Sequence, residues 1–210
     1  MGTLIYCNRL LSPKVFRQLL PVNCVQFLAT RVTPEVDLRP LTSKDQNGIL
    51  LMSLNRPSAK NALSKNMAQQ MLNRLNEVNS SYPQARVLIL RSLVPGIFCG
   101  GADLKERLAM REEEVEPLVD QLRLIGQKLA EIPFPTIAAL DGHALGGGFE
   151  MALACDLRVA AENSRMGLVE TRLAIIPGAG GSQRLPRLIG ISKSKQMIYT
   201  AQVLGTFEIV

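Results

Sequence analysis

Short apolar runs alternate along this chain with longer stretches in which apolar residues recur at helical spacing. The apolar runs predict four buried strands: "GILLMSLNRP" (48–57), "ARVLILRS" (85–92), "PTIAALDG" (135–142) and "LRVAA" (157–161). The helical spacing predicts helices over 64–80, with Ser64 as N-cap, over 112–132 and over 150–156, followed by helical pieces over 182–204 broken at Pro186 and Gly190. This alternation predicts one α/β domain, from about residue 45 to the end, with a largely buried sheet.

Composition places the positive charge mainly at the amino-terminal end. The 210 residues are 47% hydrophobic, which is enough for one substantial core, and charged residues or proline interrupt every apolar run that would otherwise approach a membrane span. Of the formal net charge of +6, four charges fall in residues 1–34, which contain no acid, so the remainder carries an ordinary +2. This basic, amphipathic segment predicts a mitochondrial presequence over residues 1–35 and a mitochondrial matrix location; a plain disordered tail is the alternative.

Cysteine and histidine do not favour a metal site. The four cysteines, Cys7, Cys24, Cys99 and Cys155, form no CxxC pair, so neither a zinc site nor a disulfide framework is indicated. His143 is the only histidine, which excludes a multi-histidine metal site and weakens any Ser-His-Asp interpretation.

Three glycine-rich stretches need an explanation: "CGGADLK" (99–105), "LGGGFE" (145–150) and "PGAGGS" (177–182). None fits a phosphate-binding loop, which needs GxxxxGK followed by Ser or Thr, or a dinucleotide fingerprint. Two interpretations remain open. The glycines permit tight turns and close packing, or they expose backbone N–H groups that form an oxyanion hole, with "GGGFE" at the positive end of a helix dipole.

Two glutamates stand in apolar surroundings beside these glycines. Glu150 begins the predicted helix "EMALACD", and Glu170 follows "GLV". A buried carboxylate must be paired, hydrogen-bonded or protonated, and its pKa rises on desolvation. Two such acids near an oxyanion hole suit general acid–base chemistry on a carbonyl compound. The alternatives are an exposed partner of the helix dipole for Glu150 and an ordinary loop carboxylate for Glu170.

The motifs "FCGGADLKE", "DGHALGGGFEMALACDLRVAAENSRMGLVE" and "IIPGAGGSQRLPRLIG" resemble, in order and spacing, those of the enoyl-CoA hydratase/isomerase (crotonase) family, in its mitochondrial branch. The resemblance covers about residues 45–203. It implies a spiral of ββα turns, assembly into homotrimers or hexamers, and an acyl-CoA thioester as substrate, with coenzyme A part of that substrate and no separate cofactor. It also implies that Ala102 and Gly147 supply the oxyanion-hole amides, that Glu150 is the base and that Glu170 is the acid in hydration of a 2-enoyl-CoA.

The resemblance further implies a coenzyme A site. The "ADLK" stretch, from Ala102 through Asp103 and Leu104 to Lys105, would hold the adenine end, and Lys60 in "RPSAKNAL" would meet the phosphates. The alternative for both lysines is a solvated surface charge. Phe149 stands where members carry a smaller or aliphatic residue, which predicts a narrowed or reshaped pocket beside Glu150.

Family members continue for roughly 60 to 70 residues beyond the point where this sequence ends, so the chain is expected to be a truncated form that lacks most of the C-terminal helical trimerisation region. For a hydratase, the expected pathway is fatty-acid or branched-chain amino-acid breakdown. Three other functions stay open: an enoyl-CoA isomerase or decarboxylase, an inactive scaffold, or RNA binding. RNA binding is known in the same branch, and residues 60–76 carry Lys60, Lys65 and Arg74, but three cations give little phosphate affinity.

Overall fold

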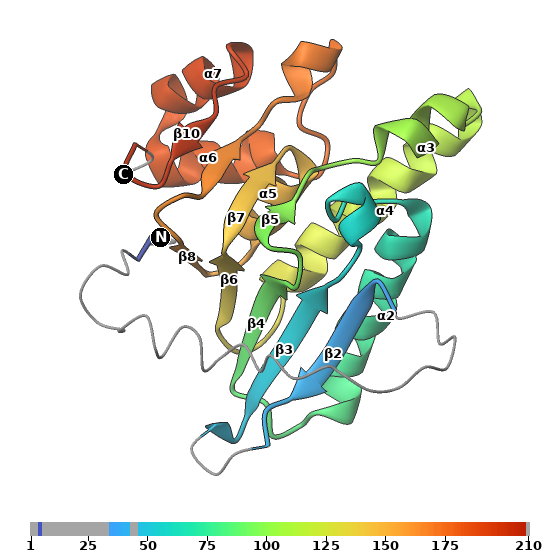
Figure 1. Ribbon diagram of the computed structural model, residues 1–210, viewed down its shortest axis with the longest axis vertical. Coiled ribbons are helices and arrows are strands. Elements are labelled where there is room, and N and C mark those ends of the chain that lie inside the picture. Colours follow the sequence, from blue (N-terminus) through green and yellow to red (C-terminus); the bar gives the residue numbers. More distant parts are fainter. Residues whose placement is uncertain (1–3, 6–33, 43–45, 209–210) are drawn as a thin grey trace.

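The computed structural model describes residues 4–5, 34–42 and 46–208, and these build two β-sheets with helices between and around them (Figure 1). The larger sheet has the order β1-β8-β6-β4-β3-β2 and is parallel except for the β2–β3 pair. The smaller sheet has the order β10-β9-β7-β5 and is parallel except for β9–β10. The strands are β1 (Leu4–Ile5), β2 (Val36–Pro40), β3 (Ile49–Leu54), β4 (Val87–Ser92), β5 (Gly96–Cys99), β6 (Thr136–Leu140), β7 (Gly142–Leu145), β8 (Leu157–Ala160), β9 (Arg165–Gly167) and β10 (Leu204–Gly205).

Pairs of consecutive strands divide between the two sheets. In each of the pairs β4–β5, β6–β7 and β8–β9, the first strand joins the larger sheet and the second joins the smaller one, and a helical segment follows. The chain therefore advances as a spiral of ββα turns, which confirms the predicted fold class.

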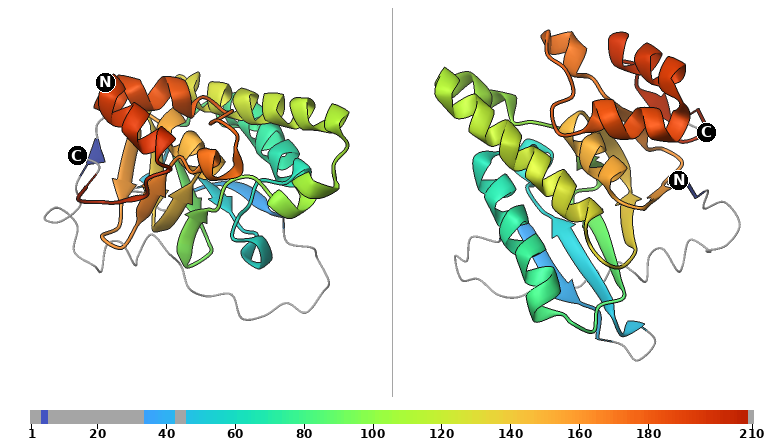
Figure 2. Two further views of the ribbon diagram at one scale, coloured as in Figure 1. Left: turned by 90° about the horizontal axis from the view of Figure 1, so that it is seen from above. Right: turned by 180° about the vertical axis from the view of Figure 1, so that it is seen from behind.

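The helices are η2 (Pro57–Ala59), α2 (Lys65–Ser81), α3 (Leu104–Ala109), α4 (Glu112–Ala130), α5 (Gly147–Ala154), η3 (Glu170–Leu173), α6 (Gly181–Ile189) and α7 (Ile191–Tyr199). Figure 2 shows α2 and α4 side by side over one face of the larger sheet. Ser64 caps α2 as predicted, since its Oγ accepts from Met67 N at 3.1 Å.

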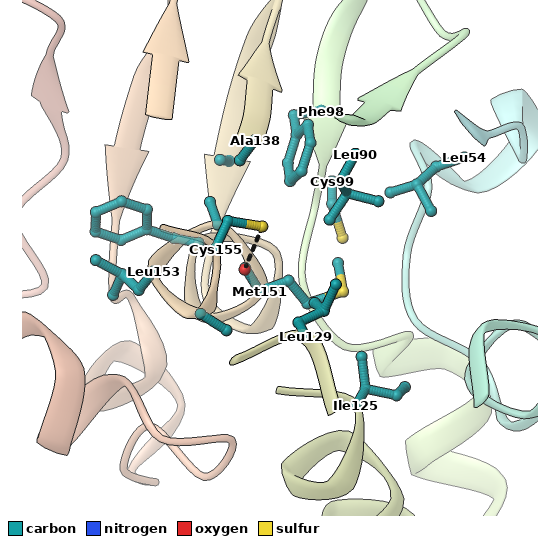
Figure 3. Close-up of a cluster of buried hydrophobic side chains, with 14 of the residues drawn as sticks. Leu54, Leu90, Phe98, Cys99, Ile125, Leu129, Ala138, Met151, Leu153 and Cys155 are labelled. Atoms are coloured by element: carbon teal, nitrogen blue, oxygen red, sulfur yellow. Dashed lines mark hydrogen bonds between the residues drawn. The ribbon is translucent and has the colours of Figure 1, made fainter. Parts of the chain in front are cut away.

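The core lies where α4 and α5 meet the sheets (Figure 3). Ile125 and Leu129 of α4 face Phe98 of β5 and Met151 of α5, and all four are buried. Every residue of α5 is buried, which explains why its sequence shows little amphipathic pattern. This central helix carries Glu150 into the interior, so the core also fixes one of the candidate catalytic groups.

The four strands and the helices predicted over 64–80 and 112–132 are confirmed, with small differences at their ends. The helix predicted over 150–156 begins earlier, at Gly147, and the last helical piece ends at Tyr199 and not at residue 204. The predicted break at Gly190 is confirmed, but the predicted break at Pro186 is wrong. Pro186 lies inside α6, and the helix runs on to Ile189, where Gly190 ends it. Proline removes one i→i−4 bond there, and the burial of Leu185 and Gly181 on the same helix offsets that loss.

The amino-terminal predictions fall mainly on residues outside the described ranges. The presequence expected over residues 1–35 lies there except for Leu4–Ile5 and residues 34–35, and so do Cys7 and Cys24. The larger sheet also includes β2, which lies upstream of residue 45, the predicted start of the domain. Within the described part of the chain, no helix combines the length and apolar character needed to cross a membrane.

Candidate active site

Three chain segments leave the smaller sheet at the same edge. The strands β5, β7 and β9 are parallel, so the residues after Cys99, Leu145 and Gly167 emerge side by side. These three segments contain the glycine stretch with Ala102, the glycine stretch with Gly147, and the turn with Glu170. The topology thus brings together residues that are far apart in the sequence.

The amide of Ala102 is turned away from its neighbouring segment. Leu63 N donates to Gly101 O at 2.7 Å, and Asp103 N donates to Leu63 O at 3.0 Å. These two bonds flank Ala102 in a parallel bridge with Leu63, so its own N–H points to the opposite side. That amide donates to no acceptor within the described residues.

The amide of Gly147 belongs to the first residue of α5, where an N–H has no intrahelical partner. It also lies close to the first segment. A Cβ on Gly101, whose φ is +95°, would sit 3.6 Å from Gly147 N. A Cβ on Gly148 would lie 2.6 Å from Cys99 Cβ and closer still to Cys99 O, so only glycine permits this approach of α5 to β5. The close-packing interpretation of the glycines is therefore confirmed for Gly148, and the packing brings the segments of Ala102 and Gly147 close together.

Glu150 is buried on α5, with only 3% of its surface exposed. Its Oε1 accepts from Ala179 N at 2.8 Å and from Gly181 N at 2.7 Å. Burial raises the pKa of this carboxyl, while the two amides and the charges of Arg184 and Arg123 act in the opposite direction. The exposed dipole partner considered for Glu150 is therefore wrong, because the side chain is held inside the protein.

Glu170 is the first residue of η3 and is also buried. Its Oε2 is buried and has no hydrogen-bond partner within the described residues. Desolvation and the nearby charge of Glu150 raise the pKa of Glu170 to about 7, although its own backbone N–H acts to lower it. Burial thus raises the pKa of both carboxyls, but two backbone amides oppose this effect at Glu150, whereas the nearby charge of Glu150 adds to it at Glu170.

These groups line one pocket of about 480 Å³. Ala102, Gly147, Glu150 and Glu170 all contribute to its wall. The rest of the wall is mainly aliphatic, with contributions from α3, α4 and the segment after η3: Leu104, Val119, Leu122, Leu173, Ala174, Ile175 and Ile176. An apolar pocket with two acids and two free amides suits an acyl chain bearing a polarised carbonyl.

Two arginines in the pocket wall, Arg107 and Arg123, escaped the sequence analysis. Arg123 donates through Nε to Gly178 O at 2.9 Å and pairs with Asp120 at 2.8 Å, whereas Arg107 lies on the short helix α3. No motif marked either residue, and both line the pocket only because α3 and α4 border it.

The residues predicted to bind coenzyme A lie at or beside this pocket, but they differ in exposure and in the contacts that they already make. Leu104 lines it, and Lys105 and Lys60 are exposed. Asp103 is already engaged: it caps α3 by accepting from Lys105 N and Glu106 N at 3.1 Å and pairs with Arg56 at 2.6 Å. Burial acts to raise the pKa of Asp103, but the bond from Arg56 and the two amides outweigh it and hold that pKa low.

Phe149 does not reshape the pocket as predicted, because its side chain is buried on the core side of α5 and is not part of the pocket wall. Cys99 and Cys155 are buried free thiols, and desolvation raises the pKa of each to about 12. Among the residues that the structure describes, no three His, Cys, Asp or Glu side chains are grouped so that they could hold a metal ion.

Comparison with known proteins agrees with this fold. Residues 44–209 match the model of the enoyl-CoA hydratase/isomerase family, and the chain belongs to that family. It is 52% identical to mouse methylglutaconyl-CoA hydratase, mitochondrial, over 86% of this chain and 57% of that protein. It is 48% identical to mouse enoyl-CoA hydratase domain-containing protein 2, mitochondrial, over 87% of this chain and 61% of that protein.

Solved structures show the same architecture. The enoyl-CoA hydratase of Bacillus anthracis superposes with a TM-score of 0.78 at 44% identity, over 83% of this chain and 66% of that one. DspI of Pseudomonas aeruginosa superposes with a TM-score of 0.75 at 26% identity, over 87% of this chain and 71% of that one. The fold is therefore the crotonase fold, and the chain spans somewhat more than half the length of the curated relatives it matches.

Proposed function

We propose that this chain hydrates a 2-enoyl-CoA thioester to the 3-hydroxyacyl-CoA. The observation that carries the proposal is the pocket in which Ala102 and Gly147, whose N–H groups donate to no acceptor within the described residues, lie beside two buried glutamates, Glu150 and Glu170. Family membership and the names of the relatives support it.

In the proposed reaction the thioester carbonyl oxygen accepts from the Ala102 and Gly147 amides. These donors stabilise the enolate that forms when water adds to Cβ, and the α5 dipole favours negative charge at the same place. Fixed donors act without reorganisation, and removal of one such donor typically costs about 10²–10³ in kcat. Collapse of the enolate takes a proton at Cα and restores the thioester, so that one water molecule is added overall.

Glu150 and Glu170 divide the two proton transfers. Glu150 is the base that takes a proton from water, because two amide donors favour its ionised form. Glu170 is the acid that protonates Cα, because its Oε2 has no hydrogen-bond partner within the described residues and its pKa is about 7. This division requires neither a metal nor a separate cofactor.

The substrate's coenzyme A portion would enter past Ala102, Asp103, Leu104 and Lys105. Lys60 lies next to this entrance, since its carbonyl accepts from Gly100 N at 3.0 Å. Both lysines are exposed and would meet phosphates as mobile cations. The acyl group would lie against the aliphatic wall from α4 and from the segment after η3.

The names of the relatives add the cellular setting to the proposal. Methylglutaconyl-CoA hydratase and the mouse enoyl-CoA hydratase domain protein are both named as mitochondrial, as is a probable enoyl-CoA hydratase of Arabidopsis thaliana. We therefore propose a mitochondrial matrix enzyme of fatty-acid or branched-chain amino-acid breakdown that works as a homotrimer or hexamer.

The test follows the loss of the conjugated enoyl-thioester absorbance with crotonyl-CoA. Wild type should consume it, and Glu150→Gln and Glu170→Gln should each lower kcat by about 10²-fold or more, since each removes one proton transfer. Glu162→Gln, at an exposed position in the turn before β9, is the matched control and should retain activity. An inert wild type would reject the proposal and leave an inactive scaffold. Equal activity in all four proteins would reject the roles proposed for the two glutamates.

A further inference from the structure

The loop that leads into α2 (residues 56–64) lies against the residues that follow β5, and hydrogen bonds join the two segments. Leu63 bonds to Gly101 O and Asp103 N on either side of Ala102, and Lys60 O accepts from Gly100 N. Strand β5 of the smaller sheet ends at Cys99, before Ala102. The position of the Ala102 amide is therefore set by the 56–64 loop and not by that sheet.

Asn61 is the residue that fastens this loop to the strand. It is fully buried, and its Nδ2 donates to Phe98 O at 3.0 Å and to Ser92 Oγ at 2.8 Å. Its Oδ1 accepts from Arg56 N at 2.7 Å. The backbone takes part as well, because Asn61 O accepts from Cys99 Sγ at 3.0 Å. The side chain thus uses both donors and its acceptor to hold β4, β5 and the loop together.

The backbone at this point is also unusual. Lys60 and Asn61 both have φ of +53°, in the left-handed region that residues other than glycine seldom adopt. Asparagine tolerates this region better than most side chains, and consecutive residues of this kind persist only where the surroundings hold them. The hydrogen bonds of Asn61 supply that restraint.

We propose that Asn61 is a positioning residue for the oxyanion hole, one that keeps the Ala102 N–H directed at the thioester oxygen. Asn61 is not part of the pocket wall and acts only through the strand end that it fixes. The inference rests on the proposed function, in which Ala102 supplies one of two donors.

Substitution by glycine separates the side chain from the backbone. Asn61→Gly keeps access to the left-handed region but removes all three side-chain hydrogen bonds. We expect kcat for crotonyl-CoA to fall by about 10- to 100-fold with KM little changed, because a displaced donor weakens the transition state more than the ground state. The pH dependence should keep its shape, since Glu150 and Glu170 are untouched.

A spectroscopic measurement distinguishes positioning from mere destabilisation. The absorbance of bound cinnamoyl-CoA shifts to the red when donors polarise its conjugated carbonyl, and Asn61→Gly should show a smaller shift than wild type. Thr136→Val is the matched control. It removes two hydrogen bonds at the start of β6, away from the 56–64 loop, because the buried Thr136 Oγ1 donates to Asp156 Oδ2 and accepts from Asp156 N, both at 2.8 Å.

Retention of the full red shift in Asn61→Gly would overturn the inference. So would an equal reduction in Thr136→Val at matched thermal stability, or a wild type that binds cinnamoyl-CoA with no shift. A wild type that shifts the ligand but does not hydrate crotonyl-CoA would contradict the proposed function alone, and the shift would still decide the role of Asn61.

Discussion

Glu170 is held where a carboxyl is expensive to ionise. Its Oε2 is buried without a hydrogen-bond partner in the described part of the chain, and Glu150 contributes a like charge nearby. Glu150 is equally enclosed but receives two backbone amides. The same residue type therefore meets two different environments, and these are the basis for proposing opposite roles for the two glutamates.

This asymmetry has a consequence for stability. The pKa of Glu170 in the folded state is about 7, above its ordinary value of 4.5. Below pH 4.5 the Glu170 carboxyl is protonated in both the folded and the unfolded state, so its burial does not lower the stability. Between pH 4.5 and about 7 it ionises first in the unfolded state, and the free energy of unfolding therefore falls as the pH rises. The loss should reach about 2–3 kcal/mol above pH 7.

Glu170→Gln removes the ionisable group, so the variant should escape the loss of stability that wild type undergoes as the pH rises. The measurement is the difference in thermal midpoint between the two proteins at pH 5 and at pH 8, followed by circular dichroism. We expect the difference to move in favour of the variant at pH 8. A difference independent of pH would show that Glu170 ionises normally.

The same residue also predicts the pH dependence of turnover. If Glu170 donates the proton to Cα, kcat/KM for crotonyl-CoA should decline above an apparent pKa of about 7, as the acid is lost. The two glutamates interact, so this value belongs to the pair. A rate that rises through pH 7 to 9 would contradict the assignment of Glu170 as the acid.

At the scale of elements, the contact of α5 with β5 decides the geometry of the site. Gly148→Ala would push a methyl group into Cys99, and relief of that clash requires movement of the helix that carries Gly147 and Glu150. We expect a loss of about 1–3 kcal/mol in the free energy of unfolding, measured by urea denaturation, together with loss of turnover.

Gly100→Ala is the matched control for this substitution. A Cβ there would lie 3.4 Å from Lys60 O, which is an ordinary contact, so stability and activity should be kept. If both alanine variants behave alike, the close approach of α5 to β5 is not what the fold depends on.

The elements also show what the sequence could and could not predict. The larger sheet and long helices were predictable because their apolar runs and periodicities are strong, and the motif resemblance located Ala102, Gly147, Glu150 and Glu170. The strands β5, β7 and β9 escaped prediction because each is only three or four residues long and contains glycine. Arg107 and Arg123 escaped it because the pocket joins α3, α4 and η3 through tertiary contacts alone.

At the scale of the whole molecule, the structure bears on the RNA-binding alternative. Lys65 pairs with Glu114 at 2.6 Å and Arg74 pairs with Glu77 at 2.9 Å, so two of the three cations considered are already neutralised. We expect the double substitution Lys65→Ala, Arg74→Ala to leave RNA retention on filters unchanged at about 0.15 M salt. A tenfold loss would place RNA on this face of α2.

The central claim is that a water molecule is added across the double bond in this pocket, and isotopic labelling tests it most directly. Crotonyl-CoA is incubated with the chain in D₂O enriched in ¹⁸O, and the product is analysed by mass spectrometry. The account predicts 3-hydroxybutyryl-CoA with solvent oxygen at Cβ and solvent deuterium at Cα, formed by wild type but not by Glu150→Gln or Glu170→Gln. Deuterium exchange without ¹⁸O incorporation would contradict hydration and indicate an isomerase.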